Sequence, residues 1–177
     1  MKTIKHKFSG KSLLELKTQF GLGEKGFYDN TWWLKEKFAS EKPAKGTYEI
    51  VFHPELNNLT YQEQLEKLGD KEEFLHPAIL AEAILTYYQK SGGRLMESWW
   101  SRTISVDSDG YRVDVGGFDS DGLHVYSGSD GYRYDNLGLS ASRKFKGSRK
   151  LENLDIESRL SVLENFKKKV EEVLKLK

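Results

Sequence analysis

The chain has 177 residues, of which 37% are hydrophobic and 31% are charged, and its 28 basic and 27 acidic residues leave a formal net charge of +1. An aromatic content of 12% is too high for a disordered chain, and the balanced charge does not favour nucleic-acid binding. The chain has no cysteine, which excludes disulfides, thiolate catalysis and cysteine-bound metals.

Residues 1–98 are predicted to form a mainly helical scaffold, because apolar residues at helical spacing recur between short breaks. Thr60 and Glu63 fit a capping box, and residues 70–73 repeat that pattern. One segment, 47–52, is instead rich in β-branched and aromatic residues, which predicts a strand. The predicted helices cover residues 12–20, 31–42, 61–69 and 77–90.

Residues 151–177 carry the clearest helical pattern, with Asp155 as a suitable N-cap and lysines crowding the C-terminal half, where cations complement the helix dipole. This long C-terminal helix is predicted either to pack on its own chain as a lid or to pair with another subunit in a homo-oligomer. Its apolar stripe consists of Ile156, Leu160, Leu163, Phe166, Val170 and Leu174.

Residues 107–136 differ in composition from the rest of the chain. This window contains seven Asp, six Gly, four Ser and four Tyr, but no Lys, Glu, Ala, Gln, Met or Trp. Its two arginines and seven aspartates give it a charge of −5, which leaves +6 for the other 147 residues. The near-neutral chain therefore averages an acidic segment and a basic remainder.

Apolar and polar residues alternate in the window, which predicts two short strands, 111–115 and 123–126. Asp-Gly pairs supply turns around these strands. We expect one face of each strand to lie in the core and the other to present polar and aromatic side chains. Tyrosine among small polar residues is typical of binding loops, so the window is interpreted as a binding surface rather than a solvated loop.

The stretch 99–145 resembles the C-terminal region of diversity-generating retroelement variable proteins. Residues 115–118 (Val-Gly-Gly-Phe) and 135–139 (Asp-Asn-Leu-Gly-Leu) are similar to the Gly-Gly turn and closing strand of their C-type-lectin-like fold, of the formylglycine-generating-enzyme subtype. The resemblance implies an α+β, C-type-lectin-like fold with short antiparallel strands. A single domain, 1–177, would then contain the helical N-terminal half, a lectin-like sheet over 99–146 and the long C-terminal helix.

In such systems, adenine mutagenesis turns Asn codons into codons for Tyr, Asp, Ser, Gly, His and similar residues, but not for Lys, Glu, Gln, Met or Trp. The window obeys this restriction. Phe118 departs from the Trp common in the subtype, and the calcium-binding triplets of animal lectins are absent, so no carbohydrate ligand is implied. The candidate ligand-binding positions are Tyr111, Asp114, Gly117, Asp119, His124, Tyr126, Ser127, Ser129, Gly131, Tyr132 and Tyr134.

Three other chemistries fit the sequence less well. The Asp-rich turns resemble calcium loops, but an EF-hand starting at Asp107 would have Phe118 where a bidentate Glu is required. The four histidines lack metalloprotease spacing, and no phosphate-binding loop or Gly-x-Ser-x-Gly motif occurs, so we expect no enzyme, cofactor or metal. Basic clusters, such as 143–146 and 167–169, are predicted to be solvated surface rather than a nucleic-acid site.

The sequence therefore predicts a non-enzymatic binding protein that displays a diversified Tyr/Asp/Ser/Gly surface to a protein or cell-surface target. The alternative is an intracellular adaptor or regulatory domain in which the same acidic surface binds one fixed protein partner. No apolar run reaches the length of a membrane span and no signal peptide is visible, so a cytoplasmic location is the default expectation.

Overall fold

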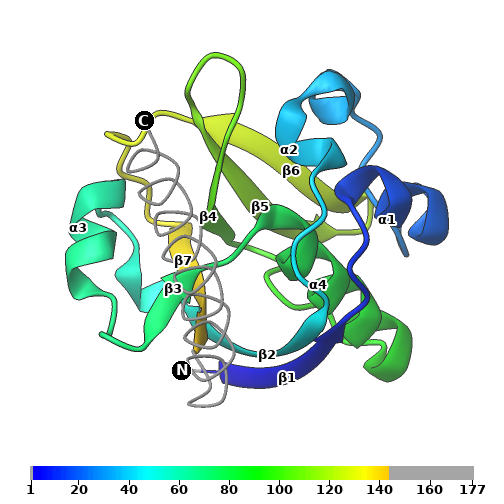
Figure 1. The fold of residues 1–177 in the computed structure, drawn as a ribbon, viewed down its shortest axis with the longest axis horizontal. Coiled ribbons are helices and arrows are strands. Elements are labelled where there is room, and N and C mark those ends of the chain that lie inside the picture. The colour runs from blue at the N-terminus through cyan, green and yellow to red at the C-terminus, as the bar shows by residue number, and fades with distance from the viewer. Residues whose placement is uncertain (1, 144–177) are drawn as a thin grey trace, which may run out of the picture. The chain divides into compact units, whose positions relative to one another are not determined.

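The computed structural model describes residues 2–143, which are dominated by one seven-stranded mixed sheet (Figure 1). The strands follow the order β1-β2-β7-β4-β5-β6, and β3 pairs with β7. Neighbouring strands run antiparallel except β4 and β7, which are parallel. The strands are β1 (Lys2–Phe8), β2 (Gly46–His53), β3 (Glu72–Phe74), β4 (Trp100–Val106), β5 (Arg112–Asp119), β6 (Gly122–Gly128) and β7 (Leu137–Arg143).

The helices begin and end at the local signals of the sequence. The capping box of Thr60 and Glu63 is present at the start of α3, and α4 ends at Gly92, whose left-handed φ of 68° suits glycine. Within residues 2–143, no helix is long and apolar enough to cross a membrane. The helices are α1 (Leu13–Phe20), α2 (Lys37–Ser40), α3 (Tyr61–Lys67) and α4 (Pro77–Ser91), with 3-10 turns at Trp32–Lys35 and Pro54–Leu56.

The prediction of an α+β, C-type-lectin-like fold with a helical N-terminal half is wrong, because that half contributes β1, β2 and β3 to the large sheet. In β1, the alternating lysines point outward, and only every second side chain reaches the interior, ending with His6 and Phe8. Residues 70–73 do not start a helix, since Glu72 pairs with Arg143 of β7. The predicted helix over 151–177 and residues 144–146 of the predicted sheet lie outside the described residues.

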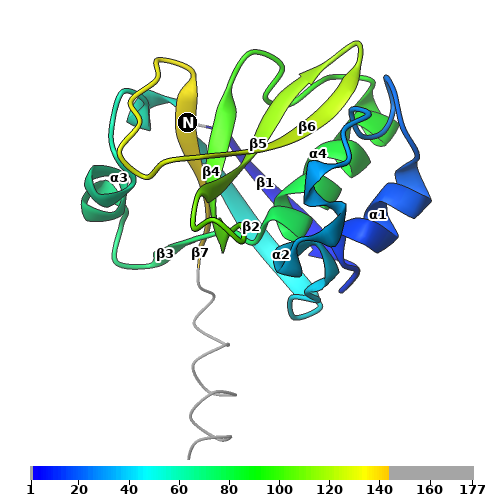
Figure 2. The same cartoon turned by 90° about the horizontal axis from the view of Figure 1, so that it is seen from above.

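The core lies between the sheet and α4, which packs against β1, β4 and β5. Val113, Val115 and Val125 are at most 1% exposed and belong to this core together with Trp33. In both ribbon views α3 lies beside β3 and β7, far from α1 and α2 (Figures 1 and 2). The strands β5 and β6 thus have one face in this core and another, called here the outer face, directed away from it.

β6 is the last strand of the sheet, and its outer edge is covered by the segment that follows α1. The Tyr28 backbone N–H donates to the carbonyl oxygen of Leu123, and the Leu123 N–H donates to that of Gly26, both at 2.9 Å. The side chains of Asn30 and Trp32 both donate to the carbonyl oxygen of Val125 on the same strand, at 3.1 and 2.9 Å. A covered edge fixes the strand that carries several candidate residues and prevents pairing with other chains.

Candidate functional site

The outer face of β4, β5 and β6 carries two rows of directly paired residues. Arg102 pairs with Asp114, which pairs with Tyr126 in the next strand. The parallel row consists of Trp100, Gly116 and His124. Because directly paired residues share one face of a sheet, these side chains form one surface. The predicted alternation in β5 and β6 is therefore confirmed, with the valines inside and Asp114, His124 and Tyr126 outside. The candidate Ser127 is an exception, because it pairs with Val113 and shares the face of the valines.

Glycines in β5 make room for an aromatic cluster on the outer face. A Cβ atom on Gly117, whose φ is +56°, would lie 2.5 Å from Cζ2 of Trp100. The Trp100 ring lies 5.1 Å from the ring of Tyr126 and 5.5 Å from that of His124, centroid to centroid. Tyr28 stacks on His124 at 4.1 Å. Gly117, a predicted binding position, is buried, and its lack of a side chain leaves room for the indole of Trp100.

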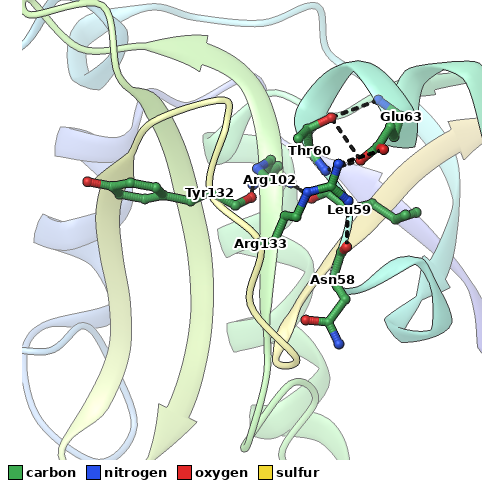
Figure 3. A network of polar contacts seen from close by, with 7 residues as sticks. All are labelled: Asn58, Leu59, Thr60, Glu63, Arg102, Tyr132 and Arg133. Carbon is green, nitrogen blue, oxygen red and sulfur yellow. Dashed lines mark hydrogen bonds and ion pairs between the residues drawn. The ribbon is translucent and has the colours of Figure 1, made fainter.

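A loop, residues 129–136, crosses beside the outer face and is held through its main chain. The carbonyl oxygen of Tyr132 accepts a hydrogen bond of 2.5 Å from Nη2 of Arg102, whose Nη1 donates to the carbonyl oxygen of Leu59 at 2.8 Å. The carbonyl oxygen of Tyr134 accepts one of 2.9 Å from the Asn58 N–H. Figure 3 shows the two arginines, Arg102 among them, that link this loop to residues 58–63.

The second arginine, Arg133, joins the loop to the start of α3. Its Nη2 donates to Oε1 of Glu63 at 2.7 Å, and its Nη1 donates to the carbonyl oxygen of Asn58 at 3.1 Å (Figure 3). Glu63 also caps α3 through Thr60, and these hydrogen bonds, first from the Thr60 N–H and then from Arg133, lower the pKa of Glu63 to about 2. One carboxylate therefore ties the loop to a helix terminus.

The loop also has a side-chain clamp on β5. Arg112 donates from Nε and Nη2 to the two carboxylate oxygens of Asp130, at 3.0 and 2.9 Å. The guanidinium lies 3.8 Å from the centroid of the Tyr61 ring, and the Tyr61 N–H donates to the carbonyl oxygen of Asp130. This bidentate geometry fixes the beginning of the loop.

The tyrosine side chains of the loop, by contrast, face solvent. Tyr132 and Tyr134 are each 50% exposed, and their rings contact each other edge to face at 5.6 Å. Tyr111 in the β4–β5 turn and Tyr126 on β6 are 49% and 43% exposed. Four large amphipathic side chains therefore project from an ordered backbone.

A cavity of about 350 Å³, called here the Asp114 pocket, lies between the outer face and the loop. Asp114 is 8% exposed, and its Oδ1 atom is buried without a hydrogen-bond partner. Burial raises the pKa of Asp114 to about 8, although the nearby Arg102 and Arg112 act in the opposite direction. The residues that line the pocket include Trp100, Asp114, Tyr126, Tyr132, Tyr134 and Asn136.

The other acidic candidate, Asp119, and the non-candidate Asp107 both accept hydrogen bonds within turns. Oδ1 of Asp119 accepts a hydrogen bond from the Asp121 N–H at 2.8 Å and lies 3.7 Å from Nε2 of His124. In the preceding turn, Oδ1 of Asp107 accepts hydrogen bonds from the N–H groups of Asp109 and Tyr111. Between residues 2 and 143, no group of three or more His, Asp or Glu residues could hold a metal ion. These carboxylates order backbone turns, as Asx turns do.

Three arginines that sequence reasoning missed, Arg102, Arg112 and Arg133, organise the site. A signal was available for two of them, because Arg112 and Arg133 are the only basic residues in an otherwise acidic window. Two arginines among seven aspartates are good candidates for internal ion pairs. Arg102 carries no such signal, since it precedes the window and its partners are main-chain carbonyls.

The eleven predicted positions divide by burial. Asp114 and Gly117 are buried, five positions are exposed, and the others are half-buried. Six of the eleven line the Asp114 pocket, namely Asp114, Tyr126, Ser127, Ser129, Tyr132 and Tyr134. No protein-family model, curated protein or solved structure matches this chain, so the site is interpreted from its own geometry.

Proposed function

We propose that this chain is a non-enzymatic binding protein that presents a tyrosine-rich surface to a protein or cell-surface target, as diversity-generating retroelement variable proteins do. The observation that carries the proposal is the way the loop 129–136 is held. Its main-chain carbonyls, Asp130 and Arg133 make the anchoring contacts, while Tyr132 and Tyr134 project from it half exposed. Side chains at such positions can change without loss of the supporting contacts.

The exposed side chains suit recognition in energetic terms. Tyrosine buries a large area with only two rotatable side-chain bonds, and tyrosines are common where binding energy concentrates. The rings of Tyr126, Tyr132 and Tyr134 surround one pocket. Because their backbone is already ordered, little conformational entropy is lost when a partner binds.

The charge of the surface favours a basic or mixed protein partner over a phosphate-rich ligand. The window 107–136 has a net charge of −5, although Asp130 is paired with Arg112 and the turn aspartates accept backbone hydrogen bonds. Such hydrogen bonds do not remove the negative charge. It can therefore still steer a basic partner toward the site.

A direct test is to replace five exposed positions together with serine. We expect the free energy of unfolding to change by no more than about 0.5 kcal/mol per position, because exposed side chains contribute little to stability. Val125→Ser, on the buried face of β6, is the control and should destabilise strongly. A collapse of the thermal midpoint in the five-fold variant would show that these residues are core and defeat the display proposal. The five positions are Tyr111, Tyr126, Gly131, Tyr132 and Tyr134.

The alternative of one fixed partner is favoured by Asp114 and Gly117, which are buried and in close contact with their neighbours. The genomic DNA separates the two proposals. A diversified protein requires a nearby imperfect repeat that differs mainly at adenines, together with a reverse transcriptase gene. A locus without them would favour the adaptor.

A further inference from the structure

The Asp114 pocket combines a carboxyl group that lacks a donor with an aromatic wall. The cavity of about 350 Å³ is at the small end of the range for ligand sites, so it suits one side chain better than a large molecule. The Oδ1 atom of Asp114 is buried and unpaired. The pocket is also lined by Trp100, Tyr126, Tyr132 and Tyr134.

The neighbouring cations direct their hydrogen bonds elsewhere. Arg102 donates to two main-chain carbonyl oxygens, which hold the loop. Arg112 donates to Asp130 and to the carbonyl oxygen of Ile104. Both guanidinium groups lie near enough to influence Asp114 electrostatically, yet neither has a hydrogen bond to its Oδ1 atom. Among residues 2–143, no group therefore donates a hydrogen bond to Oδ1 of Asp114.

We infer that the Asp114 pocket binds the alkylammonium end of a lysine side chain from a protein partner, an inference that rests on the proposed binding function. An ammonium group supplies the missing N–H donors, and its charge is attracted to the faces of aromatic rings. A lysine ammonium can donate to the carboxylate from several directions, whereas the forked guanidinium of arginine needs two oxygens side by side. An anion or an apolar group would leave Oδ1 unpaired.

Binding of a cation here is coupled to release of a proton. The groups that face Asp114 are Arg102 on β4, Arg112 on its own strand, Tyr126 on β6 and Asp130 in the loop. With a pKa of about 8, the carboxyl group is mainly protonated at pH 7. An ammonium ion stabilises the ionised form, so its affinity should rise with pH, by up to about tenfold per unit below pH 8.

Two small probes test this inference on the full chain. Nα-acetyl-lysine N-methylamide carries the ammonium group, and the norleucine equivalent has a similar length without the charge. Titration followed by the indole N–H resonance of Trp100 should show the lysine probe binding at least about tenfold more tightly, with a dissociation constant in the millimolar range. Equal binding of the two probes, or no shift of the Trp100 signal up to about 50 mM lysine probe, would overturn the inference.

Two variants separate charge recognition from a general structural effect. Asp114→Asn keeps the shape of the side chain but cannot ionise, so it should remove both the preference for the lysine probe and the rise of affinity with pH. Tyr132→Leu keeps an apolar wall without a ring and should weaken the lysine probe about threefold to thirtyfold while leaving the norleucine probe nearly unchanged. If Asp114→Asn is folded and binds the lysine probe as tightly as the parent does, the inference is wrong.

The inference and the proposed function can fail separately. If the five-fold serine variant keeps its thermal midpoint while the parent does not bind the lysine probe, the proposal of a display surface is retained and lysine recognition is excluded. If the parent binds the lysine probe selectively but the five-fold variant unfolds, the pocket stands, and the tyrosines belong to a fixed site instead of a variable one.

Discussion

The loop 129–136 and the strands β5–β6 both carry predicted binding positions, but they hold those positions by different atoms. In the strands, the side chain of Asp114 and the missing side chain of Gly117 are themselves part of the packing. In the loop, Tyr132 and Tyr134 are held by their main-chain carbonyl groups, and their rings are half exposed. The strands β5 and β6, called here the fixed floor, cannot change these side chains without loss of packing. The loop 129–136, called here the changeable rim, can exchange its tyrosine side chains.

This difference shows why residue type alone does not identify a variable position. Asp, Gly, Ser and Tyr occur in both regions, and the restricted alphabet of the window treats them alike. Tolerance to substitution depends on whether the side chain or the main chain of a residue makes its contacts. Substitutions in the two regions should therefore have unequal effects on stability.

The largest expected effect comes from Arg102, which is 1% exposed and joins the two regions. Arg102→Met would leave the carbonyl oxygens of Leu59 and Tyr132 without donors and should lower the free energy of unfolding by about 3 kcal/mol. Denaturant titration measures this change. Arg133→Met is the matched control, because its surface ion pair with Glu63 should contribute only about 1 kcal/mol or less. Equal losses in the two variants would contradict the central place given to Arg102.

A smaller effect is expected at the Gly-Gly pair within β5. Gly117→Ala places a Cβ atom 2.5 Å from the Trp100 ring and forces a left-handed φ of 56° on alanine. Together these should destabilise the fold by about 2 kcal/mol and change the near-ultraviolet circular dichroism of the indole. Gly131→Ala is the control, since its Cβ atom would meet nothing nearer than 3.7 Å. A neutral Gly117→Ala would place this residue with the changeable rim.

Local signals in the sequence were enough for the parts of the fold that depend on neighbours in the chain. The capping box of Thr60, the glycine stop at Gly92 and the alternating valines of β5 all specify structure within a few residues. The two strands, their turns and the exposed tyrosines were predicted correctly for this reason.

The rest depends on partners far apart in the chain. β1 pairs with β2, which lies about fifty residues further along the chain. The lysines of β1 weaken the alternating sequence pattern by which a strand with one buried face is usually predicted. The segment of Glu72 and Glu73 resembles a helix start in sequence, but in the structure these residues pair with Arg143 and Ser142 of β7. The contacts of Arg102 with Leu59 and of Arg133 with Glu63 join segments that no local pattern connects. The fold class was mistaken because these long-range pairings, and not local propensity, decide it.

A pH-dependent effect should distinguish the floor from the rim. The pKa of Asp114 rises from its ordinary 3.8 to about 8 on folding, so the folded chain binds this proton more tightly than the unfolded chain. Its contribution to stability is fully present below pH 3.8 and is lost as the pH rises through about 8, with a slope of up to about 1.4 kcal/mol per unit. Subtracting the stability profile of Asp114→Asn from that of the parent isolates this slope. A flat difference would mean that the carboxyl group is not desolvated as the structure indicates.

The smallest effect is expected where only the side chain changes in the rim. Tyr132→Ser should alter the free energy of unfolding by less than about 0.5 kcal/mol, because the carbonyl oxygen still accepts the hydrogen bond from Arg102. Tyr132→Pro changes the same position but removes the N–H that donates to Ser129 at 3.0 Å, and it should cost more than the serine variant. Denaturation of both variants compares the main chain with the side chain at one residue. If serine proved as damaging as proline, the ring itself would support the fold, and the separation of a fixed floor from a changeable rim would fail at a residue that is half exposed.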